Sequence, residues 1–108
     1  MMQLYLVSWD FNERSDYNKL LAAFAEDLAS VQSMPAGCEL VERLHLPHLA
    51  KGYCLCRAVS MIELMAFLGP WQKRYGMRAE IEPVLNDQEL AEYSRQSKEA
   101  WINFQPRI

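Results

Sequence analysis

The stretch from Cys38 to Val59 limits the possible folds of this chain most strongly, because it has the pattern of a β-hairpin. Residues 38–46 and 53–58 each alternate between two kinds of side chain. Such alternation is typical of strands, whose successive side chains point to opposite faces. Pro47 and Gly52 bracket the loop between the two runs. The remaining elements can be placed around this predicted hairpin.

The segment before the hairpin predicts one strand and one helix. Residues 3–9 alternate and are rich in aromatic and β-branched side chains, which favours a strand. Ser15 or Asp16 can cap a helix, which should end near residues 32–33 because Pro35 disfavours helical backbone before it. The apolar stripe of this helix consists of Tyr17, Leu20, Leu21, Phe24, Leu28 and Val31.

The segment after the hairpin predicts a second helix and a last strand. Ser60 and Glu63 have the spacing of a capping box, so a helix should begin there. The Gly69–Pro70 pair should kink or interrupt that helix before a short turn that continues to Tyr75. The strand predicted at 77–85 contains Pro83, so we expect it at a sheet edge.

A third helix follows, capped by Asn86 with Glu89, and we expect Phe104 and Ile108 in the tail to dock against the protein. The order strand, helix, strand, strand, helix, strand is that of the ferredoxin-like βαββαβ motif. We therefore predict one α+β domain over 1–108, with its core at 3–89 and an extra C-terminal helix and tail at 87–108.

In this topology both main helices cover one face of the sheet and leave the other open. Strict alternation predicts that the helix side carries Leu4, Leu6, Leu40, Leu44, Cys54, Cys56, Ala79 and Ile81. It predicts that the open face carries Tyr5, Val7, Trp9, Val41, Arg43, His45, Tyr53, Leu55, Arg57, Glu80, Glu82 and Val84. Soluble monomers rarely expose so much apolar surface, so we expect a homodimer in which a second copy covers this face.

The composition of the chain limits the partners that it can bind and indicates where in the cell it is located. The formal charge of −3 argues against broad binding to nucleic acid backbones. Leu4 to Val7 is too short for a signal-peptide core, and no run could span a membrane, so we expect a cytoplasmic protein. The three cysteines are an odd number, and we expect buried, reduced thiols. We expect no cofactor.

Several segments together resemble a family of short bacterial proteins, the domain of unknown function 3303. The resemblance is carried by YLVSWDF at 5–11, Pro35 and Gly37, Arg43 and His45, Gly52–Tyr53, and 67–89 with Trp71 and EIEPVLND. It covers roughly Tyr5 to Glu89 and implies a dimeric α+β barrel but no reaction. The chain departs from the family at Leu44, where an aromatic residue is common, and the segment from Tyr93 onward lies outside the resemblance.

The candidate site is the predicted open face. His45 is the candidate catalytic residue, as a proton carrier, or else a histidine held by Glu80 or Glu82. Arg43 and Arg57 could bind an anion, or else pair with the same two glutamates. Trp9, Tyr5 and Tyr53 would form the pocket walls, with Glu80 and Glu82 orienting the basic groups.

Three classes of function fit these residues. The first is a homodimer that binds a small organic or anionic molecule, and the second is a cofactor-independent monooxygenase-like or isomerase-like enzyme that uses His45. The third is RNA binding, since 51–58 resembles the RNP1 motif and Tyr5 and Tyr53 would be its stacking rings. Glu80 and Glu82 would repel phosphates, which disfavours the third class. His45 and His48 are poorly spaced on a strand end for a zinc site, so we expect no metal.

Overall fold

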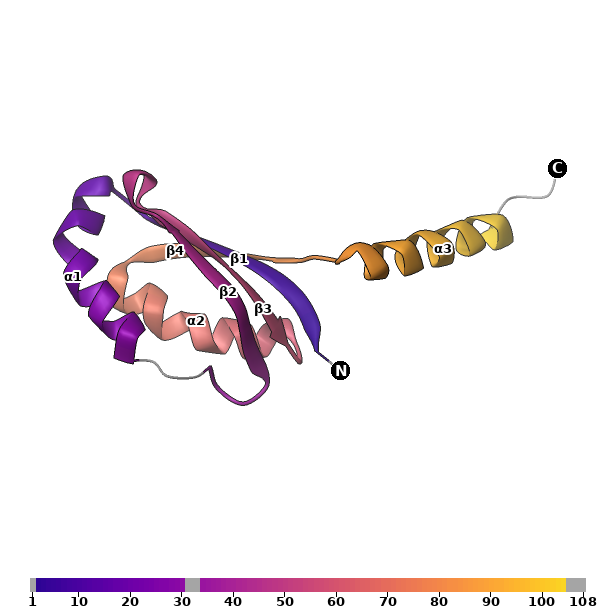
Figure 1. Ribbon diagram of the computed structural model, residues 1–108, viewed down its shortest axis with the longest axis horizontal. Coiled ribbons are helices and arrows are strands. Elements are labelled where there is room, and N and C mark those ends of the chain that lie inside the picture. The colour runs from indigo at the N-terminus through magenta and orange to yellow at the C-terminus, as the bar shows by residue number, and fades with distance from the viewer. Residues whose placement is uncertain (1, 31–33, 105–108) are drawn as a thin grey trace.

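The computed structural model describes residues 2–30 and 34–104, and it confirms an α+β fold with the predicted order of elements (Figure 1). Four strands and three α-helices follow one another as β-α-β-β-α-β-α. The elements are β1 (Gln3–Phe11), α1 (Arg14–Ser30), β2 (Cys38–Leu46), the 3₁₀ turn η1 (Pro47–Leu49), β3 (Lys51–Ala58), α2 (Met61–Tyr75), β4 (Met77–Pro83) and α3 (Asp87–Phe104).

The strands form one antiparallel sheet in the order β2-β3-β1-β4, with α1 and α2 on one of its faces (Figure 1). This is the ferredoxin-like arrangement. The edge position predicted for the proline-containing strand is confirmed, since β4 lies at the edge and ends at Pro83.

Local sequence signals explain where the helices begin. The Ser60 hydroxyl accepts a hydrogen bond from the Glu63 backbone N–H at 3.4 Å. The Asn86 side chain accepts one from the Glu89 N–H at 2.8 Å, and the Glu89 carboxylate accepts one from the Asn86 N–H at 3.1 Å. Both predicted caps are therefore confirmed, and the second is a complete capping box.

Of the kink or interruption predicted at Gly69–Pro70, the interruption is wrong, because α2 runs from Met61 to Tyr75 with Pro70 inside it. Leu68 and Tyr75 are buried on either side of Pro70, and their packing holds the helix together across the proline. The helix ends at Gly76, whose left-handed backbone (φ 63°) closes the last turn. The predicted end of the first helix at 32–33 and the docking of Ile108 lie outside the described residues.

The predicted faces of β1 are wrong. Tyr5, Val7, Trp9 and Phe11 lie under the helices and are buried, whereas Leu6 is exposed on the other face. Directly paired residues share a face, and Val7 pairs with Cys54 on one side and Ile81 on the other. The larger aromatic side chains of β1 thus fill the space beneath the helices.

A β-bulge in β2 reverses the predicted faces of its second half. Leu40 pairs with Cys56, but the next paired residue on β2 is Glu42, opposite Leu55, so Val41 is an extra residue. From there on alternation is shifted by one position. Arg43 and His45 therefore lie on the helix side and Leu44 on the open face, the opposite of the prediction.

The face assignment is confirmed for the predicted residues of β3 and β4 and for Leu40. Cys54, Cys56, Ala79 and Ile81 lie on the helix side, as Leu40 does before the bulge. The register places Tyr53, Leu55, Arg57, Glu80 and Glu82 on the open face.

The core between the sheet and the helices is rich in aromatic rings. Phe11, Phe24 and Tyr75 meet edge to face, with centroids 5.2–6.3 Å apart. The Tyr75 hydroxyl donates a hydrogen bond to Asp27 of α1, and Arg74 Nε lies 3.0 Å from the same carboxylate. These contacts join α1 to α2 at one end of the domain.

Helix α3 stands apart from this core. It projects from the end of β4 along the long axis of the molecule, whose extents are 64 × 29 × 22 Å (Figure 1). From Asp87 to Ile102 every side chain is exposed except that of Glu89, which is half-buried. No helix within the described ranges is long and apolar enough to cross a membrane.

Candidate functional site

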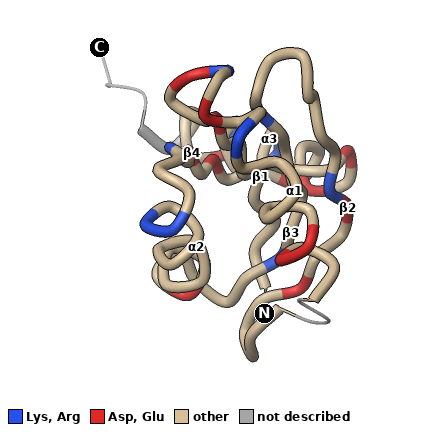
Figure 2. Tube along the Cα trace, turned by 90° about the vertical axis from the view of Figure 1, so that its left-hand side faces the viewer, with Lys and Arg blue, Asp and Glu red and all other residues tan. Residues whose placement is uncertain are grey.

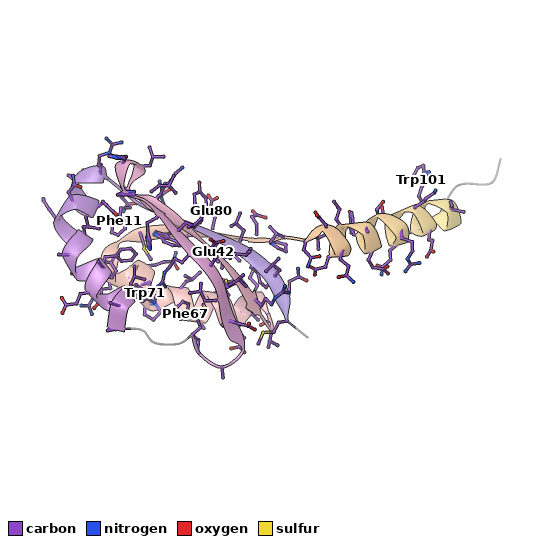
Figure 3. All side chains as sticks on the ribbon, viewed as in Figure 1. Phe11, Glu42, Phe67, Trp71, Glu80 and Trp101 are labelled. Carbon is purple, nitrogen blue, oxygen red and sulfur yellow. The ribbon has the colours of Figure 1, made fainter. Side chains whose placement is uncertain are left out.

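A small pocket lies between the sheet and the two covering helices. Its volume is about 40 Å³, room for one or two water-sized groups. Figure 3 shows Phe67 and Trp71 on the part of α2 that borders this space. The lining residues are Trp9, Phe24, Leu28, Arg43, Cys54, Phe67, Leu68, Trp71 and Met77.

Arg43 is the one charged residue among those lining residues. The bulge turns it toward the helix side, where it lies opposite Cys54 and is half-buried. Within the described part of the chain, no carboxylate lies at ion-pair distance from its guanidinium group. The pairing of Arg43 with Glu80 or Glu82 in the same protomer is wrong, because the sheet separates them.

His45 lies next to the pocket on the same side of β2. Its ring centroid is 5.8 Å from that of Trp9 and 6.3 Å from that of Phe24, both edge-on. Desolvation lowers the pKa of His45 below its ordinary value, and the nearby positive charge of Arg43 lowers it further. A neutral imidazole is therefore favoured at pH 7. Glu80 and Glu82 lie on the other face, so they do not hold this ring.

Two thiols lie beneath the pocket. All three cysteines are buried and unpaired, and Cys54 lines the pocket while Cys56 has no exposed surface. The hydrogen bond from Cys56 lowers the pKa of Cys54, against the effect of burial, and Arg43 lowers it further. The same hydrogen bond and burial raise the pKa of Cys56. Cys54 is thus the thiol of this pair that ionises more readily.

The other predicted site residues lie on the opposite side of the sheet. Tyr53, Arg57, Glu80 and Glu82 are on the open face, and Figure 3 shows Glu80 on the side away from α2. Tyr5 and Trp9 belong to the buried side with Arg43 and His45. The eight predicted site residues therefore form two groups separated by the sheet, and only Trp9 and Arg43, both from the group on the helix side, line the aromatic pocket.

The separation of Tyr5 from Tyr53 bears on RNA binding. An RRM stacks bases on aromatic rings of two neighbouring strands, and these rings must share the exposed face. Tyr5 is buried under the helices, whereas Tyr53 is on the open face with the Lys51 ammonium group 5.9 Å from its ring centroid. Acidic and basic positions are interspersed along the trace (Figure 2). This geometry does not provide the stacking pair of an RRM.

The pocket also contains residues that the sequence prediction did not single out as site residues. Phe24 and Leu28 on α1, and Phe67 and Trp71 on α2, are pairs spaced four residues apart, so each pair shares one helix face. That spacing was visible in the sequence, but it is equally typical of core packing. Among the residues that the structure describes, no group of three or more His, Cys, Asp or Glu could hold a metal ion.

Comparison with known protein families identifies the family of this chain. The family model described as domain of unknown function (DUF3303) matches residues 3–98. The chain belongs to the DUF3303 family. The DUF3303 match covers all four strands and reaches residue 98, well into α3, beyond the Glu89 limit of the resemblance seen in the sequence. No significant match was found among curated proteins or among solved structures.

Proposed function

We propose that this DUF3303 protein is a homodimeric binding module that holds a small organic anion in the pocket between its sheet and helices. The observation that carries the proposal is Arg43, a half-buried guanidinium group beside aromatic walls, with no carboxylate partner among the described residues. A partly buried charge is costly unless it is paired, and a bound carboxylate would pair it.

The neighbours of Arg43 indicate what kind of anion fits. A carboxylate can accept two parallel hydrogen bonds from a guanidinium group. Phe67, Trp71 and Trp9 present flat apolar surfaces to the rest of the ligand, which favours an aromatic or aliphatic body. At about 40 Å³ the empty pocket accepts only the head of such a molecule, so binding a larger body requires the rings of α2 to move apart.

His45 supplies a second polar contact at the edge of this pocket. Its neutral imidazole can donate one hydrogen bond and accept another, which suits a hydroxyl or carbonyl group next to the carboxylate. The ligand class that best fits these residues is therefore a small hydroxy or keto acid with an apolar body.

The test is a thermal-shift screen of such acids on three forms of the full chain. A ligand that binds the native state raises the melting temperature as its concentration rises above its dissociation constant. We expect hits on the wild type to be lost in Arg43→Gln. They should persist in Arg57→Gln, the matched control, because Arg57 lies on the neighbouring strand but on the opposite face.

Three results would contradict the proposal. If no acid shifts the melting temperature at millimolar concentration, the pocket does not bind this ligand class. A shift that survives Arg43→Gln but disappears in Arg57→Gln would move the site to the open face. If both variants bind like the wild type, neither arginine holds the ligand.

A further inference from the structure

Helix α3 has a large apolar surface on which none of the described residues packs. The exposed fractions of Leu90, Tyr93 and Trp101 are 55%, 61% and 61%. Isolated helices of this length are marginally stable in water, and the salt bridges from Arg95 to Glu92 and Glu99 add little on an exposed surface. An 18-residue helix that projects with these side chains exposed has no partner within residues 2–30 and 34–104.

The spacing of the apolar stripe along α3 indicates the shape of a partner for this helix. Leu90, Tyr93, Ser97 and Ala100 follow one another at steps of three, four and three, and Trp101 extends the same face. This is the spacing of a two-helix seam, whose apolar positions recur every 3.5 residues on average. The middle of the seam is small, with Ser97 and Ala100, while large side chains stand at both sides, so a second helix can approach closely at the centre.

The path of the chain directs α3 away from its own domain. The Val84 N–H donates to the Leu4 carbonyl at 3.0 Å, so the backbone continues the line of β4 beyond Pro83. The groove of about 290 Å³ between α2 and β4, lined by residues such as Met65 and Ile81, lies back along that strand. To fill it, α3 of the same chain would have to reverse direction within residues 84–86.

We propose that α3 pairs with α3 of a second copy, in antiparallel orientation. Charge favours the antiparallel orientation, because residues 87–92 carry three acidic groups and no basic one. An antiparallel pair sets these acidic halves at opposite ends of the seam and also opposes the two helix dipoles. A parallel pair would set the acidic halves side by side.

The seam also matches itself about Ser97. Tyr93 lies four residues before Ser97 and Trp101 four residues after it. In an antiparallel pair centred there, each tyrosine ring meets the tryptophan ring of the other helix, and the two serines meet at the two-fold axis. Two such contacts would cover the most exposed side chains of the stripe.

The first experiment compares variants of the full chain by analytical ultracentrifugation across a concentration series. We expect the Leu90→Gln/Trp101→Gln double variant to weaken the association of the two α3 helices at least about tenfold. The matched control is Ile102→Gln, which removes an equally exposed apolar side chain (59%) that lies off the stripe. Equal association constants for the double variant, the control and the wild type would overturn the proposal.

The second experiment measures the orientation with spin labels at Ser97→Cys and, separately, at Asp87→Cys. Antiparallel pairing predicts a short distance between the two labels at 97 and a distance on the order of 30 Å at 87, from ten residues of helix on each side of the axis. Short distances at both positions would overturn the antiparallel arrangement. A long distance at 97 would show that α3 docks elsewhere, for example in the groove beside α2. Unsubstituted protein, whose three cysteines are buried, measures the background of spin labelling at those native thiols.

Discussion

Gly52 on β3 lies so close to the Trp9 ring and the Leu44 carbonyl that no side chain fits there. A Cβ atom added there would lie 2.4 Å from Cζ2 of Trp9 and 2.9 Å from the Leu44 carbonyl oxygen. Neither neighbour is free to move, because Trp9 is buried in the core and the carbonyl belongs to the ladder between β2 and β3. Gly52 therefore allows the Trp9 ring to lie flat over the strand beside His45.

We predict that Gly52→Ala lowers the free energy of unfolding by about 1–3 kcal/mol, the usual cost of overpacking a core. Gly69→Ala is the matched control. A Cβ atom there meets nothing within 4 Å, and alanine favours the helix, so we expect a gain of about 0.5–1 kcal/mol. Urea denaturation followed by tryptophan fluorescence measures both. Equal effects of the two substitutions would show that Trp9 is not fixed as described.

His45 gives a prediction about pH. Its pKa should lie below the ordinary value of 6.5, and Arg43→Gln should raise it only part of the way, since desolvation is the larger cause. The unfolded chain then binds the proton more readily than the folded one. The contribution of His45 to stability is therefore complete above pH 6.5 and declines as the pH falls below that value. Titration of the ring protons by NMR, assigned with His45→Gln, tests this, and a pKa above 6.5 would contradict it.

At the scale of helices and strands, the sequence predicted correctly those features that depend on a few neighbouring residues. The caps at Ser60 and Asn86 and the edge position of Pro83 follow from hydrogen bonding within a few residues. The faces of β1 and the second half of β2 could not be obtained in this way. In β1 residues 4–7 are all apolar, so alternation in that part of the strand does not choose between the faces, and only Ser8 and Asp10 favour the observed one.

No residue in the sequence of β2 marks the position of its bulge. Val41 is neither glycine nor a turn residue, and its extra position is visible only in the pairing with β3. Because the candidate site depends on which face Arg43 and His45 occupy, Trp9 and Arg43 could be named from the sequence, whereas their grouping with the aromatic residues of the two helices could not. Similarly, the unbroken course of α2 through Pro70 depends on how Leu68 and Tyr75 pack, which is a tertiary effect.

At the scale of the whole molecule, the open face has the make-up of an interface. Leu6, Tyr53 and Leu55 occupy neighbouring positions in its middle, and Leu44, opposite Tyr53, extends this apolar group to the edge strand β2. Charged residues surround them, namely Asp10, Glu39, Glu42, Lys51, Arg57, Arg78, Glu80 and Glu82. An apolar centre within a rim of both signs is typical of surfaces that associate, which supports the proposed homodimer.

We predict that Leu44→Lys, which places a charge within the apolar group of this face, raises the dissociation constant of the dimer at least about tenfold. The control is Ile62→Lys on α2, where the side chain is 76% exposed and far from the open face in the fold. Both variants should keep the wild-type circular dichroism spectrum. A Leu44→Lys protein that sediments like the wild type at every concentration would exclude this face as the interface.

The bulge at Val41 also affects how relatives of this chain should be aligned. A relative that lacked one residue between Leu40 and Glu42 would have an unbroken alternation and would keep its counterparts of Arg43 and His45 on the helix side. A relative of the same length without the bulge would instead point those two residues away from the helices. The bulge, more than overall identity, therefore decides whether an arginine aligned with Arg43 can face the pocket.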